Sequence, residues 1–486
     1  MTVLNWLALS PVKPELFTVI LGLLLLMVGA LRGTSSSSFI VAAVIATFSV
    51  GASMMLKNLT VQSPSDTLGG MVLVDQFSIW MRFLIFSGLA ASALLSVRWL
   101  RDNDMMKFEF PLLYLFSGVG MLFMVSANNL LALYVSLELS SLSLYVLAAI
   151  QRDKLESTEA GLKYFILGAL SSGLLLFGIS LVYGFSGSLS YPEISAYVLG
   201  QETAPLGVMV GMVFILAGLV FKISAVPFHM WTPDVYQGAP TPVTAFFAIV
   251  PKVAAFGLII RLLTGPFAGL HEQYAQILVF VALGSMIVGA FAGLAQTNFK
   301  RLLAYSSIAN MGYALLGLLA GDPQGVASVI LYLTIYMVMT AGTFAILMGL
   351  SRQGKSLETI SDFAGLCKTS PAMAYCLVAL LFSMSGLPPL AGFFAKYFVF
   401  QSAVAGGYIT VAVIGVLASV VASYYYLRVI KVMLFDDPNG EFDAETSVSR
   451  RVVTYASVAF IIILTIFPNT VLEQATLAAQ SLYSGQ

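Results

Sequence analysis

Apolar stretches long enough to cross a lipid bilayer follow one another along almost the whole chain. A membrane-spanning helix needs about 20 mostly apolar residues to cross roughly 30 Å of hydrocarbon. With charged residues and clusters of Gly, Pro, Asn and Asp taken as boundaries, the sequence predicts fourteen spans, at residues 15–33, 37–57, 74–97, 110–126, 128–150, 160–184, 207–229, 240–264, 274–297, 301–320, 325–350, 371–402, 405–432 and 450–468. Only 9% of the residues are charged, against roughly 25% in a soluble globular domain. The chain is therefore predicted to be an all-α polytopic membrane protein.

Basic residues in the predicted loops lie almost entirely on one side of the membrane. Loops after even-numbered spans contain essentially Lys57 and Arg261, whereas loops after odd-numbered spans contain fifteen basic residues: Arg32, Arg98, Arg101, Lys107, Arg152, Lys154, Lys300, Arg301, Arg352, Lys355, Lys368, Arg428, Lys431, Arg450 and Arg451. Because Lys and Arg are enriched in cytoplasmic loops, the odd-numbered loops are predicted to be cytoplasmic. An even number of spans then places both termini on the periplasmic side of a bacterial inner membrane.

The motifs that hold redox centres, metals or nucleotides do not occur in the sequence. Cys367 and Cys376 form no CxxC pair, and His229 and His271 are far from both. No GxGxxG follows a strand, and no GxxxxGK segment precedes Ser or Thr. Formal charge is balanced and no basic run appears, which argues against nucleic-acid binding. We expect no cofactor and no metal in this chain.

Several ionisable residues lie inside the predicted spans, where a charge is costly. A charge at the bilayer centre costs from about 2.5 to more than 10 kcal/mol, so such residues usually face an internal cavity and mark a pathway. Glu138 lies about ten residues into its span and Lys252 about twelve, which at ~1.5 Å per residue puts both near the midplane. Together with Lys222 and Lys396, they are predicted to form a proton pathway.

Lys163 and Arg82 lie nearer the ends of their spans. Lys163 is about one helical turn into the sixth span, after Glu159, where its long side chain could reach the surface. Arg82 follows Asp75 near the outer face. This position favours interfacial anchoring of Arg82 over a place in the pathway.

The seventh and twelfth spans contain helix breakers beside their lysines. Proline removes a backbone hydrogen bond and clashes with the preceding turn, so both helices are predicted to be broken. Lys396 lies about 25 residues past the start of its span, or roughly 37 Å of straight helix, so only a break or a strong tilt keeps it at depth. The breakers are Pro227 and Pro233 beside Lys222 and His229, and Gly386, Pro388, Pro389 and Gly392 before Lys396.

These breaks fall at corresponding places in two sets of five spans. Spans four to eight occupy residues 110–264, and spans nine to thirteen occupy residues 265–434. Broken helices at matching positions are typical of inverted-repeat transporters, whose ion sites lie near mid-membrane. We therefore expect helices 1–3 within residues 1–109, two inverted five-helix repeats, and a last helix with a tail within residues 435–486.

Polar side chains form stripes along three of the predicted spans. The stripes comprise Ser136, Ser140 and Ser143 in the fifth span, Ser306, Asn310 and Tyr313 in the tenth, and Tyr332, Tyr336, Thr340 and Thr343 in the eleventh. They could hold water between the buried lysines, or they could form ordinary interhelical hydrogen bonds.

An acid and lysines in a low-dielectric cavity suit proton transfer. Burial lowers the affinity of a lysine for protons and a nearby carboxylate restores it, so small movements of charge can switch its protonation. Glu138 and Lys222 are the expected first pair. The alternative is a static buried ion pair that holds the bundle together. His229 could relay protons or cap the broken helix.

Three segments carry the most distinctive motifs of the chain: FKISAVPFHMWTPDVYQGAPTPVTAFFAIVPKVAAFG, AGLAQTNFKRLLAYSSIANMGY and SGLPPLAGFFAKY. They closely resemble the antiporter-like membrane subunits of respiratory complex I, over about residues 70–432. The chain length, the VYQGAP segment, the pair Pro251 and Lys252, and the lack of a long C-terminal lateral helix distinguish the chain from the larger members of that family.

The resemblance implies fourteen helices, two inverted repeats and a proton path through Glu138, Lys222, Lys252 and Lys396. It adds Lys163, which matches the family's lysine near the start of the sixth span. Auxiliary residues are expected at His229, Tyr305, Ser306, Asn310 and Tyr336. Several family members have a histidine where this chain has Asn310, which argues against a titrating relay at that point.

The implied activity is that of a non-redox subunit of the translocase NADH:quinone oxidoreductase. Electron transfer from NADH to quinone in other subunits would be coupled to proton transport through this chain. NADH, FMN, iron–sulfur clusters and quinone are expected in those partners, whereas this chain is expected to contact other membrane subunits, lipid, protons and internal water. Two alternatives are a subunit of a multi-subunit cation/proton antiporter and a structural subunit that transmits conformational change without carrying protons.

Overall fold

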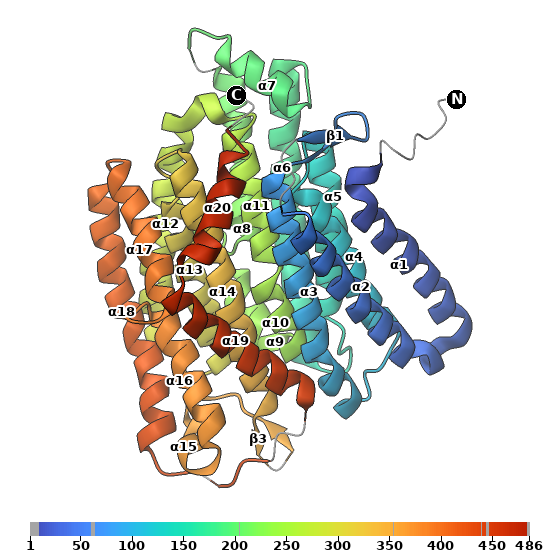
Figure 1. Ribbon diagram of the computed structural model, residues 1–486, viewed down its shortest axis with the longest axis vertical. Coiled ribbons are helices and arrows are strands. Elements are labelled where there is room, and N and C mark those ends of the chain that lie inside the picture. The colour runs from blue at the N-terminus through green and yellow to red at the C-terminus, as the bar shows by residue number, and fades with distance from the viewer. Residues whose placement is uncertain are drawn as a thin grey trace.

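The computed structural model describes residues 9–59, 64–203, 205–352, 354–438, 440–443 and 447–483, and most of them are helical. The long helices run side by side along one axis (Figure 1). In the first half of the chain the elements are η1 (Ser10–Val12), α1 (Lys13–Arg32), η2 (Gly33–Ser36), α2 (Ser37–Lys57), β1 (Ser65–Thr67), β2 (Val72–Val74), α3 (Gln76–Asp102), α4 (Glu109–Met124), α5 (Leu130–Ala148), α6 (Leu155–Ser186), α7 (Tyr191–Leu199), α8 (Leu206–Lys222), α9 (Trp231–Gly238), α10 (Thr241–Ile249) and α11 (Pro251–Thr264).

The second half of the chain is also mainly helical and ends with the helices α19 and α20. Its elements are η3 (Ala268–Leu270), α12 (His271–Leu294), α13 (Phe299–Leu316), α14 (Pro323–Gly349), β3 (Ser351–Arg352), β4 (Lys355–Ser356), η4 (Ile360–Phe363), α15 (Leu366–Thr369), α16 (Pro371–Ser385), α17 (Ala391–Ala405), α18 (Ile409–Phe435), α19 (Val448–Ile466) and α20 (Asn469–Gln480). The two antiparallel hairpins, β1–β2 and β3–β4, lie at opposite ends of the bundle (Figure 1).

Many of these helices are apolar enough to cross a membrane. Within the described residues, nine helical stretches meet the requirements of length and composition, and the shorter helices α4, α8 and α16 are apolar as well. The stretch Ser10–Lys57 contains both α1 and α2. The chain is thus a multi-pass membrane protein, as its sequence predicts, whereas the number fourteen stays a prediction.

Side-chain caps fix where several helices begin. Asp75 accepts a hydrogen bond from Ser78 N at 2.8 Å before α3, and Asn129 accepts one from Leu131 N at 2.8 Å before α5. Asp322 caps α14 in the same way. Such oxygens satisfy the amide groups that the first helical turn leaves unpaired, so each helix starts at a defined residue.

Both predicted helix breaks are present, and there is a third. The segment 223–230 separates α8 from α9, and the segment 386–390 separates α16 from α17. The eighth predicted span is divided at Val250 into α10 and α11, directly before Pro251. Each of the three deep lysines therefore lies close to an interruption of helical backbone.

Small residues allow the helices that carry the polar side chains to approach closely. A Cβ atom at Gly120 of α4 would lie 2.6 Å from the backbone oxygen of Ser136 in α5. Only glycine therefore permits this spacing, as is common at helix contacts in membranes.

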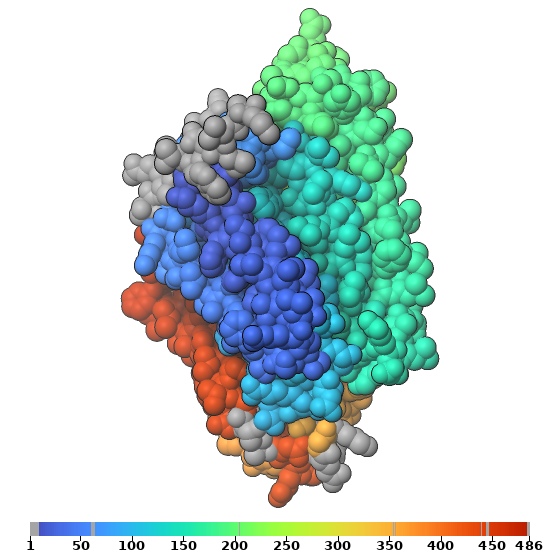
Figure 2. Space-filling model, turned by 90° about the vertical axis from the view of Figure 1, so that its right-hand side faces the viewer, coloured from blue at the N-terminus to red at the C-terminus, as the bar shows by residue number. Residues whose placement is uncertain are grey.

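The described helices begin and end at the same end of the bundle. α1 starts and α20 finishes at the end that carries α7 and β1 (Figure 1). α1 lies on the outside of the bundle, and the green segment around α7 projects beyond the other helices (Figure 2). This arrangement agrees with an even number of crossings.

Candidate functional site

Glu138 and Lys222 are linked through hydroxyl groups. Ser172 of α6 donates a hydrogen bond to Glu138 Oε1. Lys222 Nζ donates to Ser141 Oγ at 2.8 Å and to Tyr145 OH at 3.1 Å, and the Tyr145 hydroxyl lies close to Ser172. In the part of the chain that the structure describes, no ion pair within 4.0 Å joins Glu138 to Lys222. The expected first pair is thus bridged by side chains of α5 and α6.

Lys222 is the last residue of α8, directly before the break. Ser224 has φ +63°, a left-handed conformation that a helix cannot continue through. The Trp231 indole closes the break by donating to Phe221 O at 3.1 Å. Lys222 Nζ also lies 5.4 Å from the centre of the Tyr145 ring, within the range of a cation–π contact.

Lys252 is buried at the start of α11, where it contacts a serine hydroxyl and a tyrosine ring. Its side chain is 1% exposed, and its Nζ donates to Ser307 Oγ of α13. Ser307 in turn shares a hydrogen bond of 2.6 Å with Tyr336 OH of α14. The Tyr236 ring of α9 lies 5.5 Å from Lys252 Nζ. These contacts join α9, α11, α13 and α14 around one ammonium group.

A further hydrogen-bonded group on α13 lies next to that of Lys252 and includes Ser306 and Asn310. Ser306 Oγ pairs with Tyr426 OH of α18. Asn310 Nδ2 donates to Ser306 O at 2.7 Å, while Tyr332 OH of α14 donates to Asn310 Oδ1 at 2.6 Å. Asn310 therefore serves as a neutral donor and acceptor between two helices.

Lys396 lies beside the break between α16 and α17. Its Nζ donates to Ser385 O at 2.7 Å and to Ser419 Oγ at 2.7 Å, and it lies 4.8 Å from the centre of the Tyr313 ring. Gly386 has φ +79°, and a Cβ atom there would lie 2.5 Å from Lys396 Cδ. This glycine both turns the chain and leaves space for the lysine.

Two small cavities lie where the hydrogen-bonded groups are interrupted. The first, of about 20 Å³, is bounded by Lys222 on one side and by Pro251 and Ala255 of α11 on the other. The second, of about 10 Å³, is bounded by Tyr336 and Ser306. A cavity of roughly 10–15 Å³ is enough for one water molecule. Each interruption therefore has about the volume of a single water.

The remaining predicted site residues lie beside the hydrogen-bonded groups of the lysines or apart from them. Lys163 is 42% exposed and pairs with Glu159 at 2.7 Å and with Asp234 at 2.9 Å, so it lies at the surface end of α6. His229 is half-buried within the break, and its Nδ1 has no partner among the described residues. Tyr305 is half-buried on α13 and makes none of the contacts above.

The serine stripe predicted on the fifth span plays a different part from the other two stripes. Ser136 and Ser143 bond to carbonyl groups of their own helix, and Ser140 pairs with Ser117 of α4 at 3.1 Å. Ser141, one residue off the stripe, contacts Lys222 instead. Bonds within α5 and one bond to α4 therefore account for the α5 stripe, whereas residues of the α13 and α14 stripes belong to the hydrogen-bonded groups around the lysines, which we call the polar chain.

The structure also contains buried charges that the sequence interpretation missed. Arg82 is fully buried and lies 2.8 Å from Glu15, which is also fully buried, so the expected interfacial anchoring of Arg82 is wrong. Arg261, expected in a loop, lies within α11 and holds Asp75 through bonds of 2.8 and 3.0 Å. We call Glu15, Arg82, Asp75 and Arg261 the four-charge cluster.

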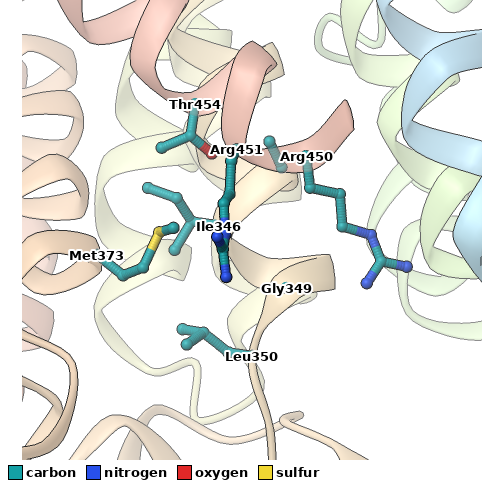
Figure 3. A pocket seen from close by; sticks show the side chains of 8 residues that line it. Ile346, Gly349, Leu350, Met373, Arg450, Arg451 and Thr454 are labelled. Atoms are coloured by element: carbon teal, nitrogen blue, oxygen red, sulfur yellow. The ribbon is translucent and has the colours of Figure 1, made fainter. Parts of the chain in front are cut away.

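Other pockets lie apart from the lysines. Figure 3 shows a narrow one between α14, α16 and α19, and none of its lining residues belongs to the polar chain: Ile346, Gly349, Leu350, Met373, Arg450, Arg451 and Thr454.

Comparison with known proteins gives consistent matches over this architecture. A family model described as "NADH:quinone oxidoreductase/Mrp antiporter, TM" matches residues 127–422. A protein of Rhodospirillum rubrum named NADH-quinone oxidoreductase subunit N is 46% identical over 476 residues, which cover 98% of each chain. NADH-quinone oxidoreductase subunit N 1 of Rhizobium meliloti is 51% identical over 451 residues, or 92% of this chain and 93% of the relative.

Solved structures show the same fold. A chain of respiratory complex I from Thermus thermophilus with bound aureothin has a TM-score of 0.81 at 30% identity, covering 96% of this chain and 100% of that one. A chain of the Mrp complex from Dietzia sp. has a TM-score of 0.86 at 21% identity, covering 97% of this chain and 98% of that one. At that identity, the second likeness concerns the fold alone.

Proposed function

Since this chain belongs to the subunit N family of NADH-quinone oxidoreductases, we propose that it conducts protons along its buried lysines. It is a membrane subunit of an oxidoreductase complex. The proton route and the residues that form it go beyond this family assignment.

One observation supports the route above all others: each deep lysine lies in a hydrogen-bonded group, and water-sized cavities lie beside two of these groups. Lys222 and Glu138 belong to the first group, Lys252 to the second and Lys396 to the last. Cavities of about 20 and 10 Å³ lie at two of the interruptions. A route built in this way conducts when water enters and stops when a cavity empties.

Hydroxyl groups are suited to carry protons between the lysines. A hydroxyl donates one hydrogen bond and accepts others, whereas an ammonium group only donates. Ser307 receives a hydrogen bond from Lys252 and shares one with Tyr336, so a proton passed to it can continue toward α14. In the proposed path the lysines hold protons, and the hydroxyl groups and water pass them on.

The proposed arrangement in the membrane has fourteen crossings, organised as two inverted five-helix repeats. The broken pairs α8 with α9 and α16 with α17 each count as one crossing, as do α10 with α11 and α19 with α20. Both termini then lie on the periplasmic side of a bacterial inner membrane, because the basic loops lie at the opposite end.

Glu138 lies close to the outer surface of the isolated chain. It is half-buried, between the exposed side chains of Val135 (57%), Leu139 (38%) and Leu142 (54%) on the same helix. An acid at this depth is costly when it faces lipid. We propose that another membrane subunit of the complex covers this face of α5.

The chain is proposed to carry no redox centre. NADH, FMN, iron–sulfur clusters and quinone would be bound by partner subunits, so the chain contributes transport alone to the translocase. A cation/proton antiporter is the less favoured reading, because the relatives that are 46% to 51% identical are named as NADH-quinone oxidoreductase subunits.

Replacement of single path residues in the intact complex tests the route. Lys222→Met, Lys396→Met and Glu138→Gln each remove a proton-binding group, so each is expected to lower NADH-driven proton translocation by about tenfold or more. The measurement is proton uptake per electron in membrane vesicles, normalised to the amount of assembled complex.

Lys431→Met is the matched control, since Lys431 is 68% exposed on α18 and contacts no residue of the path. It is expected to leave proton uptake unchanged. An assembled complex that keeps its proton-to-electron ratio in all three path variants would instead support a purely structural subunit.

A further inference from the structure

The short helix α9 contacts the lysine groups on both sides of the first cavity. Its Trp231 donates to Phe221 O at 3.1 Å, in the residue before Lys222. Its Tyr236 ring lies 5.5 Å from Lys252 Nζ. With eight residues, α9 is too short to be stable as an isolated helix, so contacts with its neighbours must hold it in place.

One carboxylate on α9 is bound from two sides. Asp234 Oδ2 lies 2.9 Å from Lys163 Nζ of α6, and its Oδ1 lies 2.7 Å from Arg301 Nη1 of α13. Arg301 also donates to Gln237 Oε1, one turn farther along α9, at 3.1 Å. Asp234 thus forms ion pairs with cations on two other helices.

A single surface salt bridge would hold α9 only weakly. The side chains of Asp234, Lys163 and Arg301 are 38%, 42% and 29% exposed, and isolated pairs of this kind contribute little. Networks with several charges are the exception. In this network the cations come from the two helices that also carry Ser172 and Ser307.

We infer that Asp234 is a positioning residue, which holds α9 between α6 and α13 and thereby sets the distance between Lys222 and Lys252. The inference rests on the proposed function of those two lysines. Asp234 itself neither binds nor passes the transported proton. Loss of either cation from its carboxylate frees α9 on one side.

The experiment compares Asp234→Asn, Asp234→Glu and Asp437→Asn in the intact NADH:quinone oxidoreductase. Asp437 is the matched control, because it forms a single ion pair of 2.7 Å with Lys368 and is 94% exposed. Two quantities are measured: hydrogen–deuterium exchange of the backbone at residues 231–238, and protons translocated per electron by the assembled complex.

Asp234→Asn is expected to increase exchange in α9 by about fivefold, because it weakens two partly exposed ion pairs, and to lower the proton-to-electron ratio. Asp234→Glu is expected to keep both the exchange of α9 and the proton-to-electron ratio close to those of the parent, since it keeps the charge. Asp437→Asn is expected to change neither. A purely structural role would reduce the amount of assembled complex and leave its proton-to-electron ratio intact.

Three outcomes would overturn the inference. In the first, Asp234→Asn leaves the hydrogen–deuterium exchange of α9 unchanged. In the second, the proton-to-electron ratio falls although exchange is unchanged. In the third, exchange increases but the proton-to-electron ratio stays the same. Lys222→Met separates this result from the proposed function. If Lys222→Met stops translocation while Asp234→Asn does not, the path stands and the positioning role is wrong. If neither variant affects translocation, the path itself is wrong.

Discussion

The three deep lysines differ in what their ammonium groups contact. Lys222 contacts hydroxyl groups that lie close to Glu138, whereas among the described residues Lys252 and Lys396 contact hydroxyl, carbonyl and aromatic groups. A buried charge without an ionic partner is costly. A lysine with neutral contacts therefore suits proton transfer better than a lysine in a permanent ion pair, because no carboxylate holds its proton in place.

Tyr336 is the hydroxyl that extends the Lys252 group toward the second cavity. Tyr336→Phe removes one oxygen while it keeps the ring, so assembly should be unaffected. Proton translocation should fall by about tenfold, because Ser307 loses its onward partner. Vesicle assays of proton uptake measure this change.

Tyr274→Phe is the corresponding control, on a buried tyrosine of α12 that lies outside the polar chain. Equal proton uptake in the two variants would exclude Tyr336 from the path.

The pH dependence of proton transport should not come from Asp234. Burial raises the pKa of this carboxyl, but hydrogen bonds from Lys163 and Arg301 outweigh burial and hold the pKa below its usual range. A carboxyl with a lowered pKa contributes stability above its unfolded pKa and loses it only as the pH falls through the lowered value. Its ion pairs should therefore persist throughout roughly pH 6 to 8.

The measurement is the pH profile of proton uptake between roughly pH 6 and 8, recorded for Asp234→Asn and for the parent. The two profiles should be parallel in shape. A titration step that appears in only one of the two profiles would mean that Asp234 does contribute to the pH dependence of proton uptake.

Sequence reasoning found the charged members of the candidate site but few of their partners. Depth within an apolar run identifies Glu138 and Lys252, because depth depends only on counting residues. Ser172 and Ser419 could not be found in this way, because each bonds to a side chain on another helix. Arg82 was misplaced because its partner, Glu15, lies in the first turn of a distant helix.

Among the elements, the interrupted helices were partly predictable. The breaks after Lys222 and before Lys396 follow from proline and glycine clusters, which leave few alternatives for the backbone. The break at Val250 was missed, because Pro251 stands alone in an otherwise unbroken apolar run. A single proline is tolerated within a membrane helix often enough that it does not predict a break.

Gly386 should be essential to the position of Lys396. Gly386→Ala adds a Cβ atom at φ +79°, 2.5 Å from Lys396 Cδ, so the lysine must move and the proton-to-electron ratio should fall. Gly407→Ala is a close control, since Gly407 has φ +86° but nothing within 4 Å of an added Cβ atom.

Both substitutions strain the backbone to a similar extent, by about 1 kcal/mol, but only the first displaces a lysine. Proton translocation per assembled complex is the measurement. Similar losses in the two variants would mean that backbone strain, and not Lys396, is responsible.

On the scale of the whole molecule, the four-charge cluster ties the first helices to the lysine-bearing bundle. Glu15 lies on α1, Arg82 on α3 and Arg261 on α11, the helix that also carries Lys252. Asp75, the N-cap of α3, completes the connection. The cluster thus fixes the outer helices against the helix at the centre of the proposed path.

Removal of one member of this cluster should destabilise the subunit strongly. Arg82→Met leaves Glu15 buried without its partner, at a cost of about 3–5 kcal/mol, whereas Glu15→Gln with Arg82→Met removes both charges and should recover most of the loss. The measurement is the thermal stability and yield of the assembled complex.

Arg98→Met on the same helix is the control. Arg98 and Asp102 form an exposed pair, at 47% and 45% exposure, which should contribute at most about 1 kcal/mol. If Arg82→Met is no more harmful than Arg98→Met, the cluster is not a structural connection.

The sequence predicts the overall architecture of the molecule better than it predicts which helices pack against each other. Apolar length and the distribution of basic residues depend only on the membrane, so a multi-pass helical chain follows from them. Which helix lies against which depends on small residues such as Gly120, whose contact with Ser136 no hydropathy pattern shows.

The helix breaks also give the path an uneven electrostatic profile. The ammonium group of Lys222 lies at the carboxyl end of α8, and that of Lys396 binds the last carbonyl of α16, so the partial negative charge of a helix end favours a cation at both. Lys252 lies where the end of α10 meets the start of α11, and their opposite partial charges largely cancel. In the proposed path, a proton would therefore be held more favourably at Lys222 and Lys396 than at Lys252 between them.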